Sequence, residues 1–231
     1  VIYDGNDKDA AEVIAAKAKE LGSPAYKVIQ AGAKVLGNNK DGIDFSLEDD
    51  YYGDTRFHIP FIAWYQVMNA SLALTTMEVL KDRIPVTMEQ LQAGIANTRW
   101  QGRMETILPG VIVDGAHNED GVRRFVETAE RFQKEYPLTL LFSAVNDKDY
   151  QDMIHTICSR IKFRKVVTTE VGGYREVPSA ELAEIFCKEG CKDVGNSDNI
   201  EEAFADSLGG YIEYRILGIS PEHYIKRPDK D

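Results

Sequence analysis

From about residue 99 onward, short apolar, β-rich runs alternate with amphipathic helical stretches, and this alternation limits the possible folds more than any other feature. The runs Val111 to Val113 and Leu138 to Phe142 are each followed by a helical pattern. Continuous apolar runs are typical of parallel strands that are covered on both faces. The pattern predicts an α/β fold with a doubly wound, mostly parallel sheet. Further strands are expected at 165–169, 192–194 and 211–216, and helices at 118–135, 150–161, 179–188 and 199–208.

The first part of the chain lacks this regularity. Its residues predict a β-hairpin with one polar face between residues 42 and 60, followed by a long helix over 61–80. A further helix is expected to open at Thr87, because Thr87 and Gln90 have the spacing of a capping box. We therefore expect two domains, 1–98 and 99–231. Shorter elements are expected at 1–3, 8–21 and 26–29.

Charge and composition exclude several classes of protein. The 27 Lys and Arg residues against 38 Asp and Glu residues give a net charge of −11, which argues against nucleic acid as a partner. No apolar run reaches the roughly 18 residues of a membrane-spanning helix, and no secretory signal is visible. The three cysteines lack zinc-site spacing, which favours reduced thiols in the cytoplasm and no metal site built from protein ligands alone. The first residue is not methionine, which indicates a fragment.

The sharpest local signal is the segment that runs from Val111 to Asn118. Here an apolar strand ends in Asp114, a turn follows with a glycine and His117, and Asn118 can cap the next helix. Ligands of open α/β sheets bind at the carboxyl ends of strands, where an acid can accept hydrogen bonds from ribose hydroxyls. Asp114 is thus a candidate ribose ligand, and His117 a candidate hydrogen-bond donor to a phosphate or carboxylate. In the alternative, Asp114 only caps the turn.

Two further polar residues are candidates for the same ligand. Arg103, beside Gly102, offers a planar guanidinium for phosphate oxygens; the alternative is a surface ion pair, for which Glu105 is a possible partner. Asn69 falls within an apolar stripe of the expected helix 61–80. A buried amide needs partners, which are either the edge of an adenine base or a neighbouring loop.

Other polar residues carry weaker signals. Asp147, Lys148 and Asp149 follow a strand, but they also suit a charged helix N-terminus. The remaining histidines lack clustered partners in the sequence, namely His58, His155 and His223.

Taken together, these segments resemble the folylpolyglutamate synthase and dihydrofolate synthase family of the Mur ligase superfamily. The resemblance covers nearly the whole chain, from Val1 to about Leu208. The most specific part is Trp-x-Gly-Arg-x-Glu followed by Asp-Gly-Ala-His-Asn. The segments that carry it are Gln66-x-x-Asn69-Ala70, Thr98-Arg99-Trp100-x-Gly102-Arg103-x-Glu105, Asp114-Gly115-Ala116-His117-Asn118 and Asp147-Lys148-Asp149.

The resemblance implies an ATP-dependent amide ligase that adds L-glutamate to folate or dihydropteroate through an acyl phosphate. Residues 1–98 would be the C-terminal part of a central ATP-binding domain, and 99–231 a Rossmann-like ligase domain. Asn69 would face adenine, Asp114 the ribose, Arg103 the phosphates, and His117 the phosphate or glutamate, with Arg103 and His117 as the catalytic residues. The complete protein is expected to be a cytoplasmic monomer.

The sequence departs from the family in two respects. The phosphate-binding loop and most Mg²⁺ ligands of the family precede the point where this sequence begins, so the chain alone is expected to be inactive. The family's Gly-Ser-Leu-Tyr-Leu segment is replaced by a different sequence over 214–223, and the polar tail 226–231 is expected to be frayed. Two alternatives remain: a non-catalytic module that binds a nucleotide or a partner, and another amino-acid ligase of the superfamily.

Overall fold

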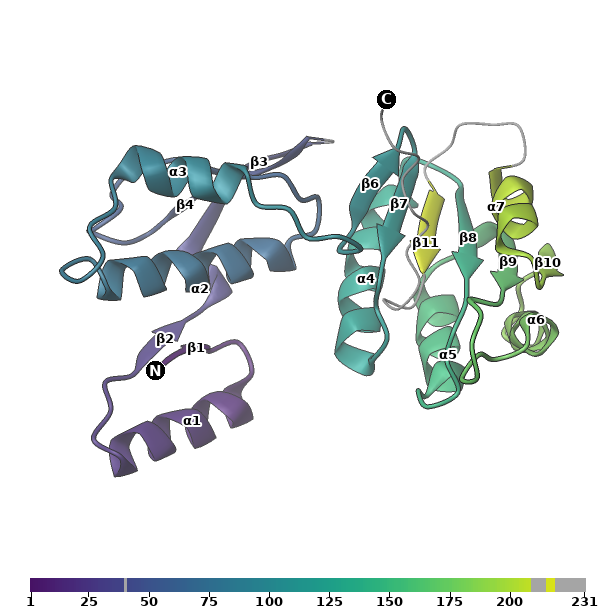
Figure 1. Cartoon of the computed structure of the whole chain (residues 1–231), viewed down its shortest axis with the longest axis horizontal. Helices are drawn as coiled ribbons and strands as arrows, with labels where there is room; N and C mark the ends of the chain where they lie inside the picture. Colours follow the sequence, from purple (N-terminus) through teal and green to yellow (C-terminus); the bar gives the residue numbers. More distant parts are fainter. Residues whose placement is uncertain (40, 209–214, 219–231) are drawn as a thin grey trace. The chain divides into compact units, whose positions relative to one another are not determined.

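The computed structural model describes residues 1–39 and 41–208, together with the backbone of 215–218 (Figure 1). The chain forms two compact units, Val1–Arg99 and Trp100–Asp231. Most of the strand expected at 211–216, the divergent segment from residue 219 on and His223 lie outside the described residues. Among the described residues, every helix is too short or too polar to cross a bilayer.

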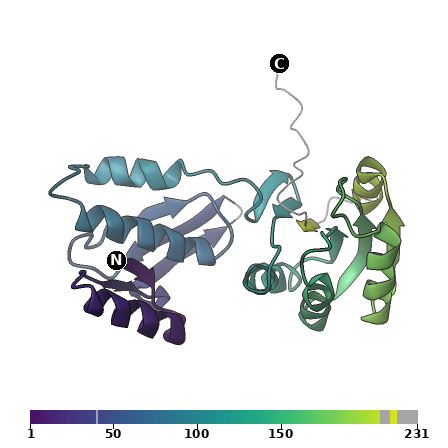
Figure 2. The same cartoon turned by 60° about the horizontal axis from the view of Figure 1, so that its bottom comes forward.

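The first unit is built around one helix, α2 (Tyr65–Val79), which packs against two small sheets. In both views α2 lies between α1 and α3 (Figure 1, Figure 2). The first sheet is parallel and pairs β1 with β2, whereas the second is antiparallel in the order β3-β4-β5. The remaining elements of this unit are β1 (Ile2–Asp4), α1 (Lys8–Glu20), β2 (Tyr26–Val28), the 3-10 helix Gln30–Gly32, β3 (Ala33–Asn39), β4 (Gly42–Leu47), β5 (Phe57–Ile59) and α3 (Met88–Ala96).

The core of the first unit lies between the antiparallel sheet and α2. Phe45 and Phe57 are buried with Tyr52, whose ring packs edge-on against Phe57 at a centroid distance of 5.5 Å. The Tyr52 hydroxyl donates a hydrogen bond of 2.6 Å to the carbonyl of Leu74 in α2, so its polar end is satisfied inside the core. The expected capping box is confirmed, since Thr87 and Gln90 exchange both hydrogen bonds at the start of α3.

Two expectations for the long helix are wrong. The helix begins at Tyr65 rather than at residue 61, because the buried residues 61–63 pack before the first helical turn. Asn69 is exposed and does not lie in a buried stripe; its side-chain amide donates to Gln66 at 2.8 Å. The helix is apolar on more than one face, so periodicity alone does not identify the buried one. The residues that are buried are Gln66, Val67, Met68, Ala70, Ser71 and Leu74.

The second unit is a six-stranded sheet in the order β10-β9-β8-β11-β7-β6, in which β6 alone pairs antiparallel. The last strand, β11 (Arg215–Gly218), is inserted between β7 and β8. The strand expected at 192–194 is observed as β10, which begins at Val194 and ends at Ser197. The other elements are β6 (Glu105–Leu108), β7 (Val111–Asp114), α4 (Glu119–Phe132), β8 (Leu138–Phe142), α5 (Tyr150–Arg160), β9 (Phe163–Thr169), α6 (Ser179–Lys188), β10 (Val194–Ser197) and α7 (Ile200–Leu208).

Helices cover both faces of this sheet. Leu140 and Phe142 lie on the face that α4, α5 and α6 cover, and the Phe142 ring is 5.3 Å from that of Phe186 in α6. Leu141 and Val113 point to the opposite face, where α7 packs. Every residue of β7 and β8 is buried, as continuous apolar strands of a covered parallel sheet should be. The expected doubly wound α/β fold is confirmed.

Candidate functional site

Asp114 ends β7 at the carboxyl edge of the sheet and is almost completely buried, with 3% of its surface exposed. Both of its carboxylate oxygens accept hydrogen bonds from the backbone. The amide of Met104 donates to Oδ2 at 2.9 Å, and the amide of Ala116 donates to Oδ1 at 2.8 Å. Asp114 therefore links the loop that precedes β6 to the turn that follows β7. This is the capping role foreseen as one alternative, and each oxygen retains a further lone pair for a ligand.

The loop 100–104 is held in a backbone conformation that places Arg103 between two left-handed residues. Gly102 has a φ of 66° and Met104 a φ of 49°, which is uncommon for a residue with a side chain. The Gly115 amide donates to the Gly102 carbonyl at 2.7 Å, and the Gly102 amide donates to Glu105 at 3.0 Å. These bonds, with the one from Met104 to Asp114, offset the strain and fix the position of Arg103.

The guanidinium of Arg103 is partly exposed and has no hydrogen-bond or ion-pair partner within residues 1–39 and 41–208. Glu105, the partner suggested by the sequence, accepts from the backbone of Gly102. The positive charge of Arg103 is near enough to Asp114 to act on its carboxylate. An arginine that is fixed through its backbone but unpaired in its side chain is suited to bind an anion.

The environment of Asp114 changes its acidity. Burial raises the pKa of Asp114, whereas the amides of Met104 and Ala116 and the charges of Arg103 and His117 lower it. With all of these effects together, the pKa is about 6. Desolvation is the largest of these effects. The carboxylate therefore changes charge close to neutral pH.

His117 lies in the turn directly after β7 and is partly buried. Its Nδ1 is 2.8 Å from the carbonyl oxygen of Gly115. A carbonyl can only accept, so Nδ1 carries the proton in this contact. The other nitrogen, Nε2, then donates to an anion only when the ring is the charged imidazolium.

The turn ends at the N-terminus of α4, where Asn118 is the cap. Its side-chain oxygen accepts from the Gly121 amide at 2.8 Å, as the sequence predicts. Gly121 packs closely here, because a Cβ atom at this position would lie 3.0 Å from that oxygen and 3.3 Å from the Cα of Ala116. The first turn of α4 therefore follows Asp114 and His117 closely in the sequence. The first backbone amides of a helix have no partner within the helix itself.

Replacement of Asn118 by alanine is expected to lower the free energy of unfolding by about 1 kcal/mol, because the Gly121 amide loses its acceptor. Urea unfolding followed by circular dichroism measures this loss. The matched control is Thr87→Ala, which removes the equivalent cap from α3 in the first unit and is expected to cost a similar amount. A variant as stable as the wild type would show that the cap contributes nothing to α4.

The segment after β8 has a structural role in the described residues. Asp149 caps α5 and accepts from the Asp152 amide at 3.2 Å, which confirms the helix N-terminus expected there. Asp147 forms an ion pair of 3.0 Å with Arg175, from the loop after β9. Lys148 lies between these two residues in the sequence, and its side chain is partly buried. We propose no functional role for it.

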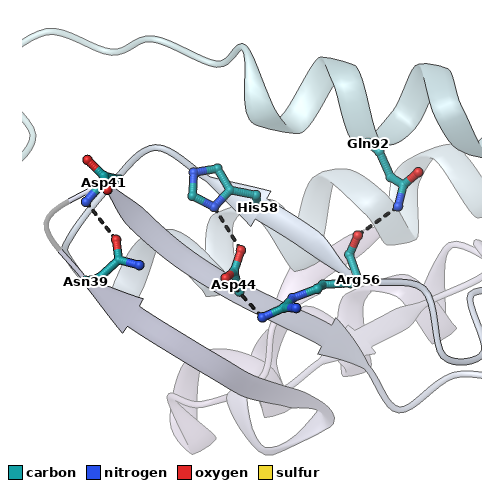
Figure 3. A network of polar contacts seen from close by, with 6 residues as sticks. All are labelled: Asn39, Asp41, Asp44, Arg56, His58 and Gln92. Carbon is teal, nitrogen blue, oxygen red and sulfur yellow. Dashed lines mark hydrogen bonds and ion pairs between the residues drawn. The ribbon is translucent and has the colours of Figure 1, made fainter.

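Two of the remaining histidines each have one carboxylate partner that the sequence does not indicate. In the first unit, His58 of β5 lies 2.9 Å from the Asp44 carboxylate of β4, and Arg56 donates to the other oxygen of Asp44 at 3.2 Å (Figure 3). Gln92 of α3 donates to the backbone carbonyl of Arg56 at 2.8 Å. In the second unit, His155 pairs with Glu189 at 3.0 Å. These partners are distant in sequence, so no local motif indicates them.

The described residues contain no group of three or more His, Cys, Asp or Glu side chains that could hold a metal ion. Arg103, Asp114 and His117 come together in the second unit, at the carboxyl end of β7. Asn69 belongs to the first unit, so its place beside the same ligand stays a prediction.

Comparison with known proteins shows which family the segment around this site resembles. Residues 102–214 match the family model described as Mur ligase, glutamate ligase domain. The match includes the loop of Arg103 and the strand-end Asp114. The second unit is therefore similar in sequence to a glutamate ligase domain, and its fold is of α/β type.

Individual relatives and solved structures give a more specific similarity than the family model does. The dihydrofolate synthase/folylpolyglutamate synthase of Bacillus subtilis is 36% identical over 126 residues, which are 52% of this chain and 29% of that protein. The folylpolyglutamate synthase of Thermotoga maritima has a similar structure, with a TM-score of 0.72 and 22% identity over 95% of this chain and 51% of that one. The Mycobacterium tuberculosis folylpolyglutamate synthase, solved with ADP and AMPPCP, has a TM-score of 0.73 and 21% identity over 93% of this chain and 51% of that one.

Residues 102–214 thus resemble the glutamate ligase domain of Mur ligases, and the chain is similar to part of the folylpolyglutamate and dihydrofolate synthases. It spans about half the length of the matched structures and less than a third of the length of the Bacillus protein.

Proposed function

We propose that the protein is an ATP-dependent ligase that joins L-glutamate to folate or dihydropteroate. The observation that carries this proposal is the arrangement of Arg103, Asp114 and His117 at the carboxyl end of β7, inside the segment that matches a glutamate ligase domain. ATP, when bound, supplies the phosphoryl group that activates the substrate carboxylate for attack by the amine of glutamate. We further propose that the protein is a cytoplasmic monomer.

The residues of the site fit a nucleotide by the chemistry of their side chains. Arg103 has no side-chain partner among the described residues, and its guanidinium is suited to bind phosphate oxygens and to neutralise their charge. Asp114 keeps a free lone pair on each oxygen, and its ionised form accepts hydrogen bonds from ribose hydroxyls. His117 as imidazolium donates from Nε2 to a phosphate or to the glutamate carboxylate. Asn69, exposed in the first unit, is proposed to face adenine.

Magnesium has no assigned ligand among the described residues. By resemblance to the family, the ion and the phosphate-binding loop are proposed to belong to the part of the matched synthases that this chain does not span. The chain would then contribute nucleotide contacts and the glutamate end of the site, and turnover would require both parts.

Binding of a fluorescent ADP analogue to the chain tests the role of Arg103. Arg103→Ala is expected to weaken binding about tenfold or more, because a charge-assisted hydrogen bond is lost. Arg160→Ala is the matched control, because Arg160 is the last residue of α5 and pairs with Glu130. This variant is expected to change binding less than about twofold. Equal binding by both variants would remove Arg103 from the site.

The reaction itself is tested by adding the remaining half of a matched synthase, fused to the chain. ADP release is then measured with ATP, glutamate and either dihydropteroate, tetrahydrofolate or a muramyl peptide. Glutamate-dependent release with a pterin substrate supports the proposal. Release only with the muramyl substrate would favour another amino-acid ligase, and no release with any substrate would favour a non-catalytic binding module.

A further inference from the structure

Two of the three cysteines of the chain touch one another. The Sγ atoms of Cys158 and Cys191 are 3.7 Å apart, although the residues are 33 positions apart in sequence. Both side chains are partly exposed, so a small reagent can reach them. Cys187, the third cysteine, is exposed and lies on α6. All three are free thiols.

The end of α6 explains why these cysteines meet. Gly190 has a φ of 93°, a left-handed conformation that ends the helix. The Gly190 amide donates to the Cys187 carbonyl at 3.0 Å, and the Cys191 amide donates back to the Phe186 carbonyl at 3.1 Å. This turn reverses the chain, and Cys191 then lies against Cys158 in the last turn of α5.

A second contact holds the same two elements together. His155, one turn before Cys158 in α5, lies 3.0 Å from the carboxylate of Glu189, two residues before Cys191. The distance between the two thiols is thus set by the helix ends and by the hydrogen bond between His155 and Glu189, and not by the cysteines alone.

We propose that Cys158 and Cys191 form a site of reversible oxidation, which a low-molecular-weight disulfide such as oxidised glutathione converts to an intramolecular disulfide. A disulfide joins its sulfurs at about 2.05 Å, so the two Sγ atoms must approach from 3.7 Å by side-chain rotation. The contact already present makes the second thiol available as soon as the first has reacted.

The reaction balances in two exchange steps. In the first, the thiolate of Cys191 attacks one sulfur of oxidised glutathione, and a glutathione thiolate leaves and takes up the proton that Cys191 released. In the second, Cys158 loses its proton and attacks the Cys191 sulfur of the mixed disulfide, which releases a second glutathione thiol. Two protein thiols are oxidised, and one glutathione disulfide is reduced to two thiols.

The environment of the pair favours Cys191 as the attacking residue. The hydrogen bond from the Cys158 thiol lowers the pKa of Cys191, whereas the same contact, together with burial, raises the pKa of Cys158. The negative charge of Glu189 raises the pKa of both. Cys158 therefore acts second, as the resolving thiol.

The thiol pair lies near the amino ends of the parallel strands, whereas Asp114 lies at the carboxyl end of β7. Cys158 lies near the end of α5, just before β9 begins, and Cys191 precedes the start of β10. Asp114, by contrast, ends its strand at the carboxyl edge. The disulfide is therefore expected to stabilise the second unit without changing nucleotide binding.

The test is a redox titration of the whole chain with mixtures of reduced and oxidised glutathione, in EDTA to exclude metal-bound thiols. Samples are quenched with iodoacetamide, digested and analysed by mass spectrometry. The wild type and Cys187→Ser are each expected to lose two thiols to one Cys158–Cys191 disulfide, which dithiothreitol reverses. Cys158→Ser is expected to accumulate glutathione on Cys191, and Cys191→Ser is expected to react more slowly at position 158.

Thermal unfolding provides a second measurement. Oxidation is expected to raise the melting temperature of the wild type and of Cys187→Ser by about 5 °C or more, and to leave Cys158→Ser and Cys191→Ser unchanged. Pairing that involves Cys187, dimers linked between chains, or no Cys158–Cys191 disulfide in excess oxidised glutathione would overturn the proposal. A lower melting temperature on oxidation would also overturn it, because the crosslink would then conflict with the native packing.

Discussion

In wild-type protein the contribution of Asp114 to the free energy of unfolding is expected to fall by about 3 kcal/mol in total as the pH rises from below about 4 to above about 6, and this fall is expected to disappear in Asp114→Asn. Burial raises the pKa of Asp114 from 3.8 to about 6. A carboxyl whose folded-state pKa is raised binds its proton more tightly in the folded state. Its contribution is therefore fully present below pH 4 and is lost as the pH passes through about 6.

Urea unfolding of the wild type and of Asp114→Asn at several values between pH 4 and pH 7 measures this effect. The difference between the two proteins isolates Asp114 from the other acidic residues. Asn118→Ala serves as the control, because it changes no ionisable group and its difference from the wild type should be the same at every pH. A difference for Asp114→Asn that is equally constant would show that the buried carboxylate does not titrate in this range.

The same replacement is expected to affect the loop of Arg103. Asparagine offers one acceptor oxygen in place of two, so either Met104 or Ala116 loses the acceptor for its buried amide. If the bond to Met104 is lost, its strained left-handed conformation is no longer compensated and Arg103 is free to move. We therefore expect Asp114→Asn to weaken binding of the ADP analogue even where the variant remains folded.

Gly42→Ala is expected to destabilise the first unit by about 3 kcal/mol or more. Gly42 has a φ of 144°, and a Cβ atom at this position would lie 2.1 Å from the backbone carbonyl oxygen of Ile59. Since β4 and β5 are paired through this region, the clash cannot be relieved by a side-chain rotation and must separate the strands. Thermal or urea unfolding measures the loss.

Gly22→Ala is the matched control for this variant. Gly22 also has a positive φ, of 62°, but a Cβ atom there would meet nothing within 4 Å. Its replacement is expected to cost only the strain of a left-handed alanine, about 1 kcal/mol. Equal losses for the two variants would show that the backbone strain matters and that the contact with Ile59 does not.

Local patterns predicted the regular part of the second unit well. The strand Leu138–Phe142 and the helix Ser179–Lys188 have the bounds that the sequence indicates, because a buried apolar run and an amphipathic stretch are both visible within one element. The Asn118 and Thr87 caps are equally local, since the donor and acceptor are three residues apart. The strands β3 and β6 were not predicted, because neither has a continuous apolar run.

The residues of the candidate site can be chosen from the sequence, but the contacts among them cannot. The order of Arg103, Asp114 and His117 in the motif is visible in the sequence. Their relation depends on the Asp114 carboxylate that accepts from Met104, ten residues away, and on two left-handed residues that no pattern reveals. Asn69 shows the opposite failure, since helical periodicity placed it in a buried stripe and the structure exposes it.

The sequence by itself determined the α/β class, the strands and helices with strong periodicity, their caps and the residues of the family motif, because each depends on neighbours within a few positions. Only the tertiary structure decided that β11 lies between β7 and β8, that His58 meets Asp44 and that Cys158 meets Cys191. The physical reason is that these contacts join residues from different strands and helices. The distances between such residues depend on the order of the strands in the sheet and on where each strand and helix ends.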